Sequence, residues 1–419
     1  MTTVQTMRTL LEAVHKDEYE SLQTLHMTSY ENRMSLLAQS FLSSPLSYRY
    51  DFSNSEEPVA ITGTGLLLKG LPGVFRLRQE AEKCAMRMFR AELSYFRPTS
   101  GLHATLCTIL AATKVNDVIY SIDPDDGGHF ATRHLVQRAG RISAFIPWDS
   151  TTLTIDLEKF KKQITIQKPD VILFEHGTPL FNLPVAEVRT IVGPSVLIVY
   201  DASHTLGLIA GGTFQDPLSE GCDILQGNTH KTFPGAQKGM MHFKNKEFGE
   251  QITASINSGL ISSHHTHHCI AEYVTTLEMD AFGAAYAQQM IRNGARLAQK
   301  LAENGIDLVG ARGVFTTSHE ILIKGDSVGG HYEGARKLMA CGISTNARVA
   351  FRTKIIRIGT QEITRRGMKE NEMDYIATLF KKALLDNESP HVLRKKIITF
   401  NNSFPHIHYS FDDKLGLRK

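Results

Sequence analysis

Long apolar stretches, excess charge and paired cysteines are all missing from this 419-residue sequence, and each absence excludes a class of protein. No apolar run reaches the ~18–20 residues that a membrane-spanning helix needs, and the N-terminal residues lack the apolar core of a signal peptide. The 46 basic and 43 acidic residues leave a net charge of only +3 with no block of like charges, so we expect no nucleic-acid partner. The five cysteines are widely spaced and form no Cys-x-x-Cys pair, so they are expected to be reduced core thiols of a cytoplasmic protein.

What remains is an ordinary globular composition, with 42% hydrophobic and 21% charged residues. Residues 4–24 place apolar side chains at helical spacing, which predicts an N-terminal helix lying on the body of the protein or on a partner subunit. From about residue 76, helices alternate with short β-branched runs, which predicts a mostly parallel sheet covered on both faces. The expected helices span residues 75–93, 102–113, 157–164 and 185–192, and the expected strands span residues 118–121, 142–146, 171–174, 196–200 and 224–225.

A second region follows the predicted sheet. A short strand at 239–243 and a histidine-rich loop lead into a long helix over 270–304, which we expect to break near Gly283 and to link two domains. From about residue 305 the pattern is α+β, with structured segments at 306–309, 320–323, 334–341, 355–358 and 373–387. We therefore predict an N-terminal helical arm over 1–50, a large domain over 51–275 and a small C-terminal domain over 276–419.

An aspartate and a lysine stand where two of these strand segments end. Asp201 closes an apolar strand, and Lys231 follows another strand-like segment in a loop of Thr, His, Pro and Gly. The carboxyl ends of parallel strands face the ligand crevice of an α/β sheet. Pyridoxal 5'-phosphate (PLP) needs such a pair, because the lysine forms the Schiff base and the acid keeps the pyridine nitrogen protonated. Spacing alone leaves open that Asp201 is a helix cap and that Lys231 is a solvated charge.

Several ordered motifs resemble the serine hydroxymethyltransferase branch of the fold-type-I PLP enzymes. Residues 201–212 (DASHTLGLIAGG) are similar to its D-x-A-H-x-x-G-L-x-A-x-G motif, and residues 229–232 (THKT) are its T-H-K-T. Residues 356–367 (IRIGTQEITRRG) resemble I-R-I-G-T-x-x-x-T-R-R-G, and shorter matches lie at 31–32 (EN), 100–101 (SG) and 127–129 (GGH). The resemblance implies an α/β fold of the aspartate aminotransferase type, with a large domain around a mostly parallel sheet and a small α+β C-terminal domain. It also implies a homodimer with its site at the subunit boundary.

The resemblance implies a set of cofactor-binding residues. Lys231 would form the Schiff base, Asp201 would pair with the pyridine nitrogen, His204 would lie near the phenolic oxygen and His129 would stack on the pyridine ring. For each of them the alternative is a purely structural role. Ser100 and Gly101 would hold the phosphate with amide donors at a helix start. Thr229 is the remaining expected cofactor-binding residue.

Substrate binding and proton transfer are implied for a second set of residues. Arg357 would grip the substrate carboxylate as a bidentate fork, a geometry that lysine does not reproduce. Glu31 and Tyr50 are the other expected substrate-binding residues. His230, next to the Schiff-base lysine, is a candidate catalytic proton shuttle besides Lys231 and His129.

The sequence departs from the hydroxymethyltransferases at three places. Their Tyr-x-Glu-Gly stretch is represented by Tyr50 and Phe52, and a phenyl ring cannot exchange a proton. Their G-P-R-G-G is here GAQKG at 235–239, and their glycine-rich phosphate loop is here SSHHTHH at 262–268. Folate-dependent one-carbon transfer is therefore not expected. The histidines of the last segment are nearly contiguous, so we expect no metal ion there.

The same departures resemble the L-threonine transaldolases of natural-product biosynthesis. The similar stretches are RPTSG at 97–101, DGGHFA at 126–131 and GNTHKTFPGAQKG at 227–239. They imply retro-aldol cleavage of L-threonine to acetaldehyde and a glycyl quinonoid, then addition to an acceptor aldehyde to give a β-hydroxy-α-amino acid. The alternatives are a serine hydroxymethyltransferase, a threonine aldolase and a non-catalytic scaffold. The sequence leaves the acceptor aldehyde open.

Overall fold

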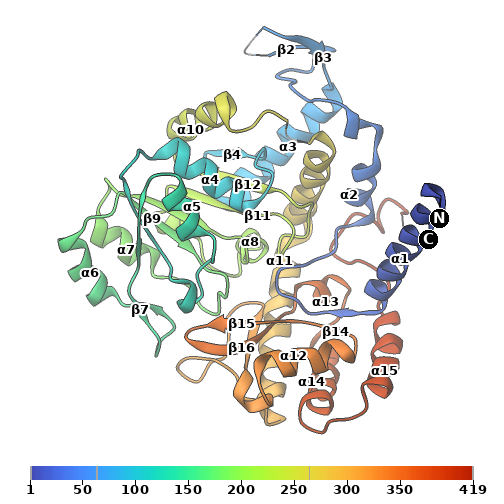
Figure 1. The fold of residues 1–419 in the computed structure, drawn as a ribbon. Helices are drawn as coiled ribbons and strands as arrows, with labels where there is room; N and C mark the ends of the chain where they lie inside the picture. The colour runs from blue at the N-terminus through green and yellow to red at the C-terminus, as the bar shows by residue number, and fades with distance from the viewer. Residues whose placement is uncertain (1, 63–64, 264, 418–419) are drawn as a thin grey trace.

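A seven-stranded sheet lies at the centre of the larger part of the computed structural model, which describes residues 2–62, 65–263 and 265–417 (Figure 1). The strand order is β4-β12-β11-β10-β9-β5-β6, and β12 alone runs antiparallel to its neighbours. This confirms the predicted mostly parallel sheet. The strands are β4 (Leu93–Tyr95), β5 (Val118–Ser121), β6 (Ile142–Phe145), β9 (Val171–Glu175), β10 (Leu197–Asp201), β11 (Ile224–Asn228) and β12 (Gly239–Phe243).

Alternate residues of the central strands enter two different cores. In β9, Ile172 and Phe174 pack with one set of helices, whereas Val171 and Leu173 pack with another. All five residues of β9 are buried, which explains the β-branched and apolar runs in the sequence. The first core includes residues of α3 (Pro72–Phe89), α7 (Val185–Val192), α8 (Leu206–Ala210) and α11 (Thr266–Glu303); the second includes residues of α4 (Gly101–Ala112), α5 (Thr132–Arg138) and α10 (Lys246–Gly259).

Two helix predictions need correction. The helix expected over 75–93 ends at Phe89, because Arg90 adopts a left-handed conformation with φ 54° and caps it before β4 begins. The long helix α11 has no break at Gly283. Gly283 instead meets Gly211, where an added Cβ would lie 2.5 Å from the Gly283 carbonyl oxygen. Gly283 thus allows α8 to pack closely against α11, and the hydrogen bonds of α11 continue through Gly283.

The C-terminal part of the chain has its own apolar core around an antiparallel sheet of order β13-β16-β15. The last turns of α11 contribute Leu297 and Leu301 to this core. Since α11 runs through the predicted boundary at 275/276 and joins both cores, the division into 1–50, 51–275 and 276–419 stays a prediction. The elements are β13 (Glu320–Lys324), α12 (His331–Ala340), β14 (Ile343–Ser344), β15 (Asn346–Ala350), β16 (Thr353–Gly359), α13 (Gln361–Arg365), α14 (Glu370–Leu384) and α15 (Pro390–Asn402).

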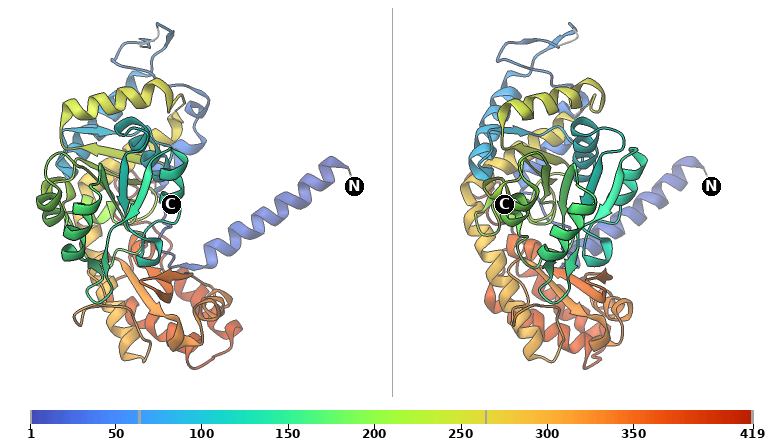
Figure 2. Two further views of the ribbon diagram at one scale, coloured as in Figure 1. Left: turned by 60° about the vertical axis from the view of Figure 1, so that its left-hand side comes forward. Right: turned by 90° about the vertical axis from the view of Figure 1, so that its left-hand side faces the viewer.

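The N-terminal segment reaches this C-terminal part. Strand β1 (Leu25–His26) pairs in parallel with β14, more than three hundred residues later in the chain. Helix α1 (Thr3–Gln23) begins with a capping box of Thr2 and Gln5, has no buried residue and projects from the body (Figure 2). The predicted N-terminal helix therefore exists but does not lie on the body of its own chain. Its contact with a partner subunit stays a prediction.

Short elements complete the fold. They are α2 (Leu36–Ser40), η1 (Phe41–Ser43), η2 (Pro45–Tyr48), β2 (Val59–Ile61), β3 (Leu67–Lys69), η3 (Pro124–Asp126), β7 (Trp148–Asp149), β8 (Thr154–Ile155), α6 (Leu157–Ile166), α9 (Pro217–Glu220) and η4 (Gly325–Val328). Within the described ranges, no helix combines the length and apolar character that crossing a membrane requires.

The packing of α8 against the loop after β11 yields a testable prediction. An added Cβ at Gly207 would overlap the backbone carbonyl of Thr232, so Gly207→Ala should lower the free energy of unfolding by about 1–3 kcal/mol. Chemical denaturation of the full chain measures this. Gly73→Ala is the matched control, because nothing lies within 4 Å of its added Cβ. Equal stability of the two variants would contradict the packing described.

Candidate active site

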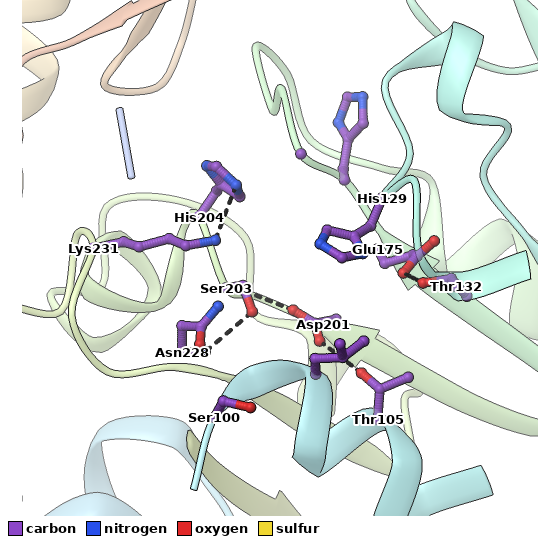
Figure 3. Close-up of a pocket in the computed structure, with 13 residues that line it drawn as sticks. Ser100, Thr105, His129, Thr132, Glu175, Asp201, Ser203, His204, Asn228 and Lys231 are labelled. Atoms are coloured by element: carbon purple, nitrogen blue, oxygen red, sulfur yellow. Dashed lines mark hydrogen bonds between the residues drawn. The ribbon is translucent and has the colours of Figure 1, made fainter. Parts of the chain in front are cut away.

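A pocket with an empty volume of about 540 Å³ opens where β9, β10 and β11 end (Figure 3). Five residues singled out in the sequence line it together: Ser100, His129, Asp201, His204 and Lys231. They come from segments that are up to 131 residues apart, from Ser100 to Lys231, and the sheet brings them together. The position at the carboxyl ends of the strands is the one expected for an α/β ligand site.

Asp201 is the last residue of β10, and three donors fix its carboxylate. Oδ1 accepts from the Ser203 backbone N–H at 2.9 Å, and Oδ2 accepts from Thr105 Oγ1 and Gln226 Nε2 at 3.3 Å each. The apolar residues before Asp201 make the strand, and the strand ends with the carboxylate on the lining of the pocket. The hydrogen bonds orient it as an acceptor for a cationic or N–H group in the pocket.

The start of α4 forms another wall. Ser100 is the N-cap, and its Oγ accepts from His103 N–H at 3.0 Å. Gly101 N–H donates to Asn228 Oδ1 at 2.8 Å, and an added Cβ at Gly101 would lie 2.8 Å from Ser203 Oγ and 2.9 Å from the Asn228 amide. Glycine is therefore required for this close approach. A helix start of this kind attracts the charge of a phosphate group.

Lys231 is almost fully buried, with 9% of its surface exposed. Its Nζ lies 3.1 Å from His204 Nε2 (Figure 3). Burial disfavours the ammonium form and lowers the pKa of Lys231 from 10.5 to about 8, although the negative charge of Asp201 opposes this shift. Close to neutrality, a useful fraction of this amine is therefore unprotonated and nucleophilic.

Burial also governs the imidazoles and the additional carboxyl group of the pocket. It lowers the pKa of His129, and it lowers the pKa of His204 well below the usual range, so both rings are neutral near pH 7. Glu175, which the sequence analysis missed, pairs with Asp201 across β9 and β10 and accepts a hydrogen bond from Thr132. Burial raises the pKa of Glu175 well above the usual range. Its position at the end of a strand next to Asp201 was the available sequence signal.

Arg357 lies at the edge of the pocket on β16. It donates to the carbonyl of Gly177, which lines the pocket, and its Nε donates to Asn346 Oδ1 at 3.2 Å. Its Cζ lies 5.5 Å from the centre of the Tyr30 ring, and its side chain is 5% exposed. The second sheet thus holds a fixed cation beside the pocket of the first, as anion recognition requires.

Other predicted residues lie outside the pocket in a single chain. Thr229 Oγ1 donates to Ala236 O at 2.7 Å and accepts from Lys238 N–H, so it braces the loop that carries Lys231. His230 is partly buried away from the pocket lining. Glu31 Oε2 lies 3.8 Å from His26 Nδ1. Tyr50 is 60% exposed, and its ring stacks on that of Phe52 with the ring centres 5.7 Å apart.

The histidine-rich segment is described only in part, because His264 lies outside the described residues. The rings of His265, His267 and His268 gather around the start of α11, with centres 4.5–6.3 Å apart. None of these three lines the pocket.

The chemistry of the pocket fits PLP. It offers a buried amine with a lowered pKa, a fixed carboxylate at a strand end and a helix start closed by a glycine that admits no side chain. With a mostly parallel sheet and a second, smaller antiparallel one, these features define the class of fold-type-I PLP enzymes.

Comparison with known proteins identifies the family. The family model described as serine hydroxymethyltransferase matches residues 64–380. A serine hydroxymethyltransferase of Methanothermobacter thermautotrophicus is 35% identical over 403 residues, which cover 93% of this chain and 92% of that protein. The chain belongs to the serine hydroxymethyltransferase family, and its cofactor is PLP.

Two further relatives carry a different activity in their names. Fluorothreonine transaldolase of Streptantibioticus cattleyicolor is 37% identical over 389 residues, covering 92% of this chain but only 61% of that longer protein. The crystal structure of L-threonine transaldolase from Pseudomonas fluorescens in its internal aldimine state matches with a TM-score of 0.90 and 29% identity. That match covers 98% of this chain and 95% of the other.

The lowered pKa of Lys231 is directly testable. In the PLP-free chain, the rate at which an amine-selective reagent modifies Lys231 should rise with a midpoint near pH 8, because burial makes the neutral amine form there instead of near 10.5. Mass spectrometry of the modified peptides measures the rate at each pH. Exposed lysines of the same chain serve as internal controls. A Lys231 midpoint as high as theirs would contradict the buried environment.

Proposed function

We propose that this enzyme is an L-threonine transaldolase, which moves the glycyl unit of L-threonine to an acceptor aldehyde. Acetaldehyde leaves, and a β-hydroxy-α-amino acid forms. The observation that carries the proposal is Phe52, which stacks on Tyr50 where the hydroxymethyltransferases have a proton-exchanging glutamate. The similarity to two transaldolases, one of them matching over almost the whole chain, supports the same activity.

Each residue of the pocket has a proposed part in this reaction. Bound PLP supplies an electron sink for the breaking Cα–Cβ bond. Lys231 would hold the cofactor covalently, Asp201 would keep its pyridine nitrogen protonated, and His129 would pack against its ring. Arg357 would bind the substrate carboxylate and so fix the orientation of Cα.

Proton transfer is assigned to neutral imidazoles. The β-hydroxyl of threonine loses a proton as acetaldehyde forms, and the acceptor oxygen must gain one. His129 and His204 line the pocket and have a lowered pKa, so they are unprotonated near neutrality and able to accept that proton. His230 lies outside the pocket of its own chain, which makes it the weaker candidate for the shuttle.

The active form is proposed to be a homodimer in the cytoplasm. Glu31 and Tyr50 lie away from the pocket of their own chain, so a substrate-binding role for them requires the pocket of a second copy. All five cysteine side chains are buried, which is consistent with a reducing compartment.

Exchange distinguishes the proposed activity from its alternatives. With L-threonine and an added aromatic aldehyde, the enzyme should release acetaldehyde and form the corresponding new β-hydroxy amino acid, because the glycyl unit is passed on. Chromatography of the amino acids and coupled detection of acetaldehyde measure both products. Glycine formation from serine that depends on tetrahydrofolate would instead indicate a hydroxymethyltransferase, and threonine cleavage indifferent to the acceptor would indicate an aldolase.

Phe52 offers a second test. Phe52→Glu should raise glycine formation relative to exchange, because a carboxyl group supplies the proton exchange that a phenyl ring cannot. The ratio of glycine to aldol product, measured at fixed threonine and acceptor, gives the effect. Phe52→Gln is the matched control, since it has nearly the same shape as the glutamate without its titration. An unchanged ratio in Phe52→Glu would remove Phe52 as a cause of the transaldolase outcome.

A further inference from the structure

A buried carboxyl group with no role in the scheme above stands behind the pocket. Glu320 is the first residue of β13 in the second sheet and has no exposed surface. Its Oε1 lies 2.9 Å from His204 Nδ1, and His204 Nε2 lies 3.1 Å from Lys231 Nζ. Glu320, His204 and Lys231 therefore form one continuous hydrogen-bonded chain that leads from the second sheet into the pocket.

This chain of hydrogen bonds determines which ring nitrogen of His204 carries the proton. A neutral imidazole carries one proton, and the partner of one ring nitrogen determines the role of the other. An ionised carboxylate can only accept, so it requires the proton on Nδ1. Nε2 then presents a lone pair to Lys231 Nζ and can only accept from that amine.

Charged and titratable groups on several elements face Glu320, among them His319, which is neutral near pH 7 because burial lowers its pKa to about 3. The nearest are Arg357 on β16, whose Nη1 lies 3.9 Å from Oε1, and the neighbouring His319, whose Nε2 lies 3.8 Å away. Arg348 on β15 and Lys231 act from a greater distance. Burial raises the pKa of Glu320 to about 7, and Arg357 is the largest influence in the opposite direction. The carboxyl group thus changes its charge close to physiological pH.

Metal binding is the competing use of these residues. Donor atoms of His204, His319 and Glu320 lie within 4.8 Å of one another. However, the Arg357 guanidinium already faces the same carboxylate oxygen, and Lys231 faces the far side of His204. Two cations at these positions disfavour a divalent ion by charge repulsion.

We propose that Glu320 is a positioning residue that fixes His204 as the Nδ1–H tautomer. Its Nε2 then serves as the hydrogen-bond acceptor for the Lys231 amine. This inference rests on the role of Lys231 in the proposed function. Whenever the Lys231 amine is free, His204 holds it by accepting one of its hydrogens. An amide in place of the carboxylate removes this constraint, because it can either accept from Nδ1–H or donate to Nδ1.

The experiment compares Glu320→Gln with Glu362→Gln, a control that alters another buried glutamate which does not line the pocket. Nitrogen NMR of the full chain with ¹⁵N-labelled histidine reports the tautomer, with the His204 signals identified by their loss in His204→Asn. In the wild type and the control, His204 should be the Nδ1–H tautomer above pH 8, where Glu320 is ionised. Glu320→Gln should populate the Nε2–H tautomer at the same pH.

The Lys231 amine supplies the second readout. In Glu320→Gln, the midpoint of Lys231 modification in the PLP-free chain should fall by about one pH unit, because a nearby negative charge is lost. A merely structural role would leave the tautomer unchanged. Should Glu320→Gln fail to fold, Glu320→Asp retains the carboxylate and the wild-type tautomer above pH 8 decides.

Three results would overturn the proposal. They are a wild-type His204 in the Nε2–H form above pH 8, identical His204 tautomers in Glu320→Gln and the control, and added Zn²⁺ shifting the signals of both His204 and His319. The proposed function fails on different grounds. Loss of threonine exchange with His204 in the Nδ1–H form above pH 8 would reject transaldolation and leave the positioning role of Glu320 standing.

Discussion

The pocket depends on the burial of one amine. Lys231 is removed from water, which disfavours its ammonium form, and the surrounding groups offset that cost without abolishing it. Asp201 and Glu320 stabilise the charge, whereas Arg357 opposes it. A pKa near 8 is the result of this balance, and it makes a lysine usable as a nucleophile under ordinary conditions.

Both sheets contribute groups to that balance. Asp201 ends a strand of the large sheet and Lys231 follows another, whereas Glu320 and Arg357 belong to the small antiparallel sheet. Groups from the two sheets contact one another at hydrogen-bond distance, so the two cores must be joined rigidly. Helix α11 contributes side chains to both cores over its 38 residues, and the close contact of Gly211 with Gly283 packs it against the sheet side.

Much of this could be predicted from the sequence, because apolar periodicity marks strands and Asp201 and Lys231 follow two of them. The errors have physical causes. Gly283 suggested a helix break on local propensity, but tertiary packing overrode it. Glu175 and Glu320 were missed because a carboxylate at the end of an apolar run resembles an ordinary surface position until burial is known. Glu31 and Tyr50 do not line the pocket of their own chain, and their substrate-binding role stays a prediction.

The pairing of β1 with β14 has a consequence for how the protein is made. Residues 25–26 are synthesised more than three hundred residues before their partners at 343–344. Asn32, just after β1, donates to the Lys231 carbonyl at 2.5 Å, so the early segment also helps to hold the lysine loop. The parallel sheet can assemble during synthesis, but contacts of such long sequence separation form slowly and only once both ends are present. The pocket is therefore completed only after β14 has been made, and a chain that ends before β14 would carry the lysine without the pairing that anchors the segment behind its loop.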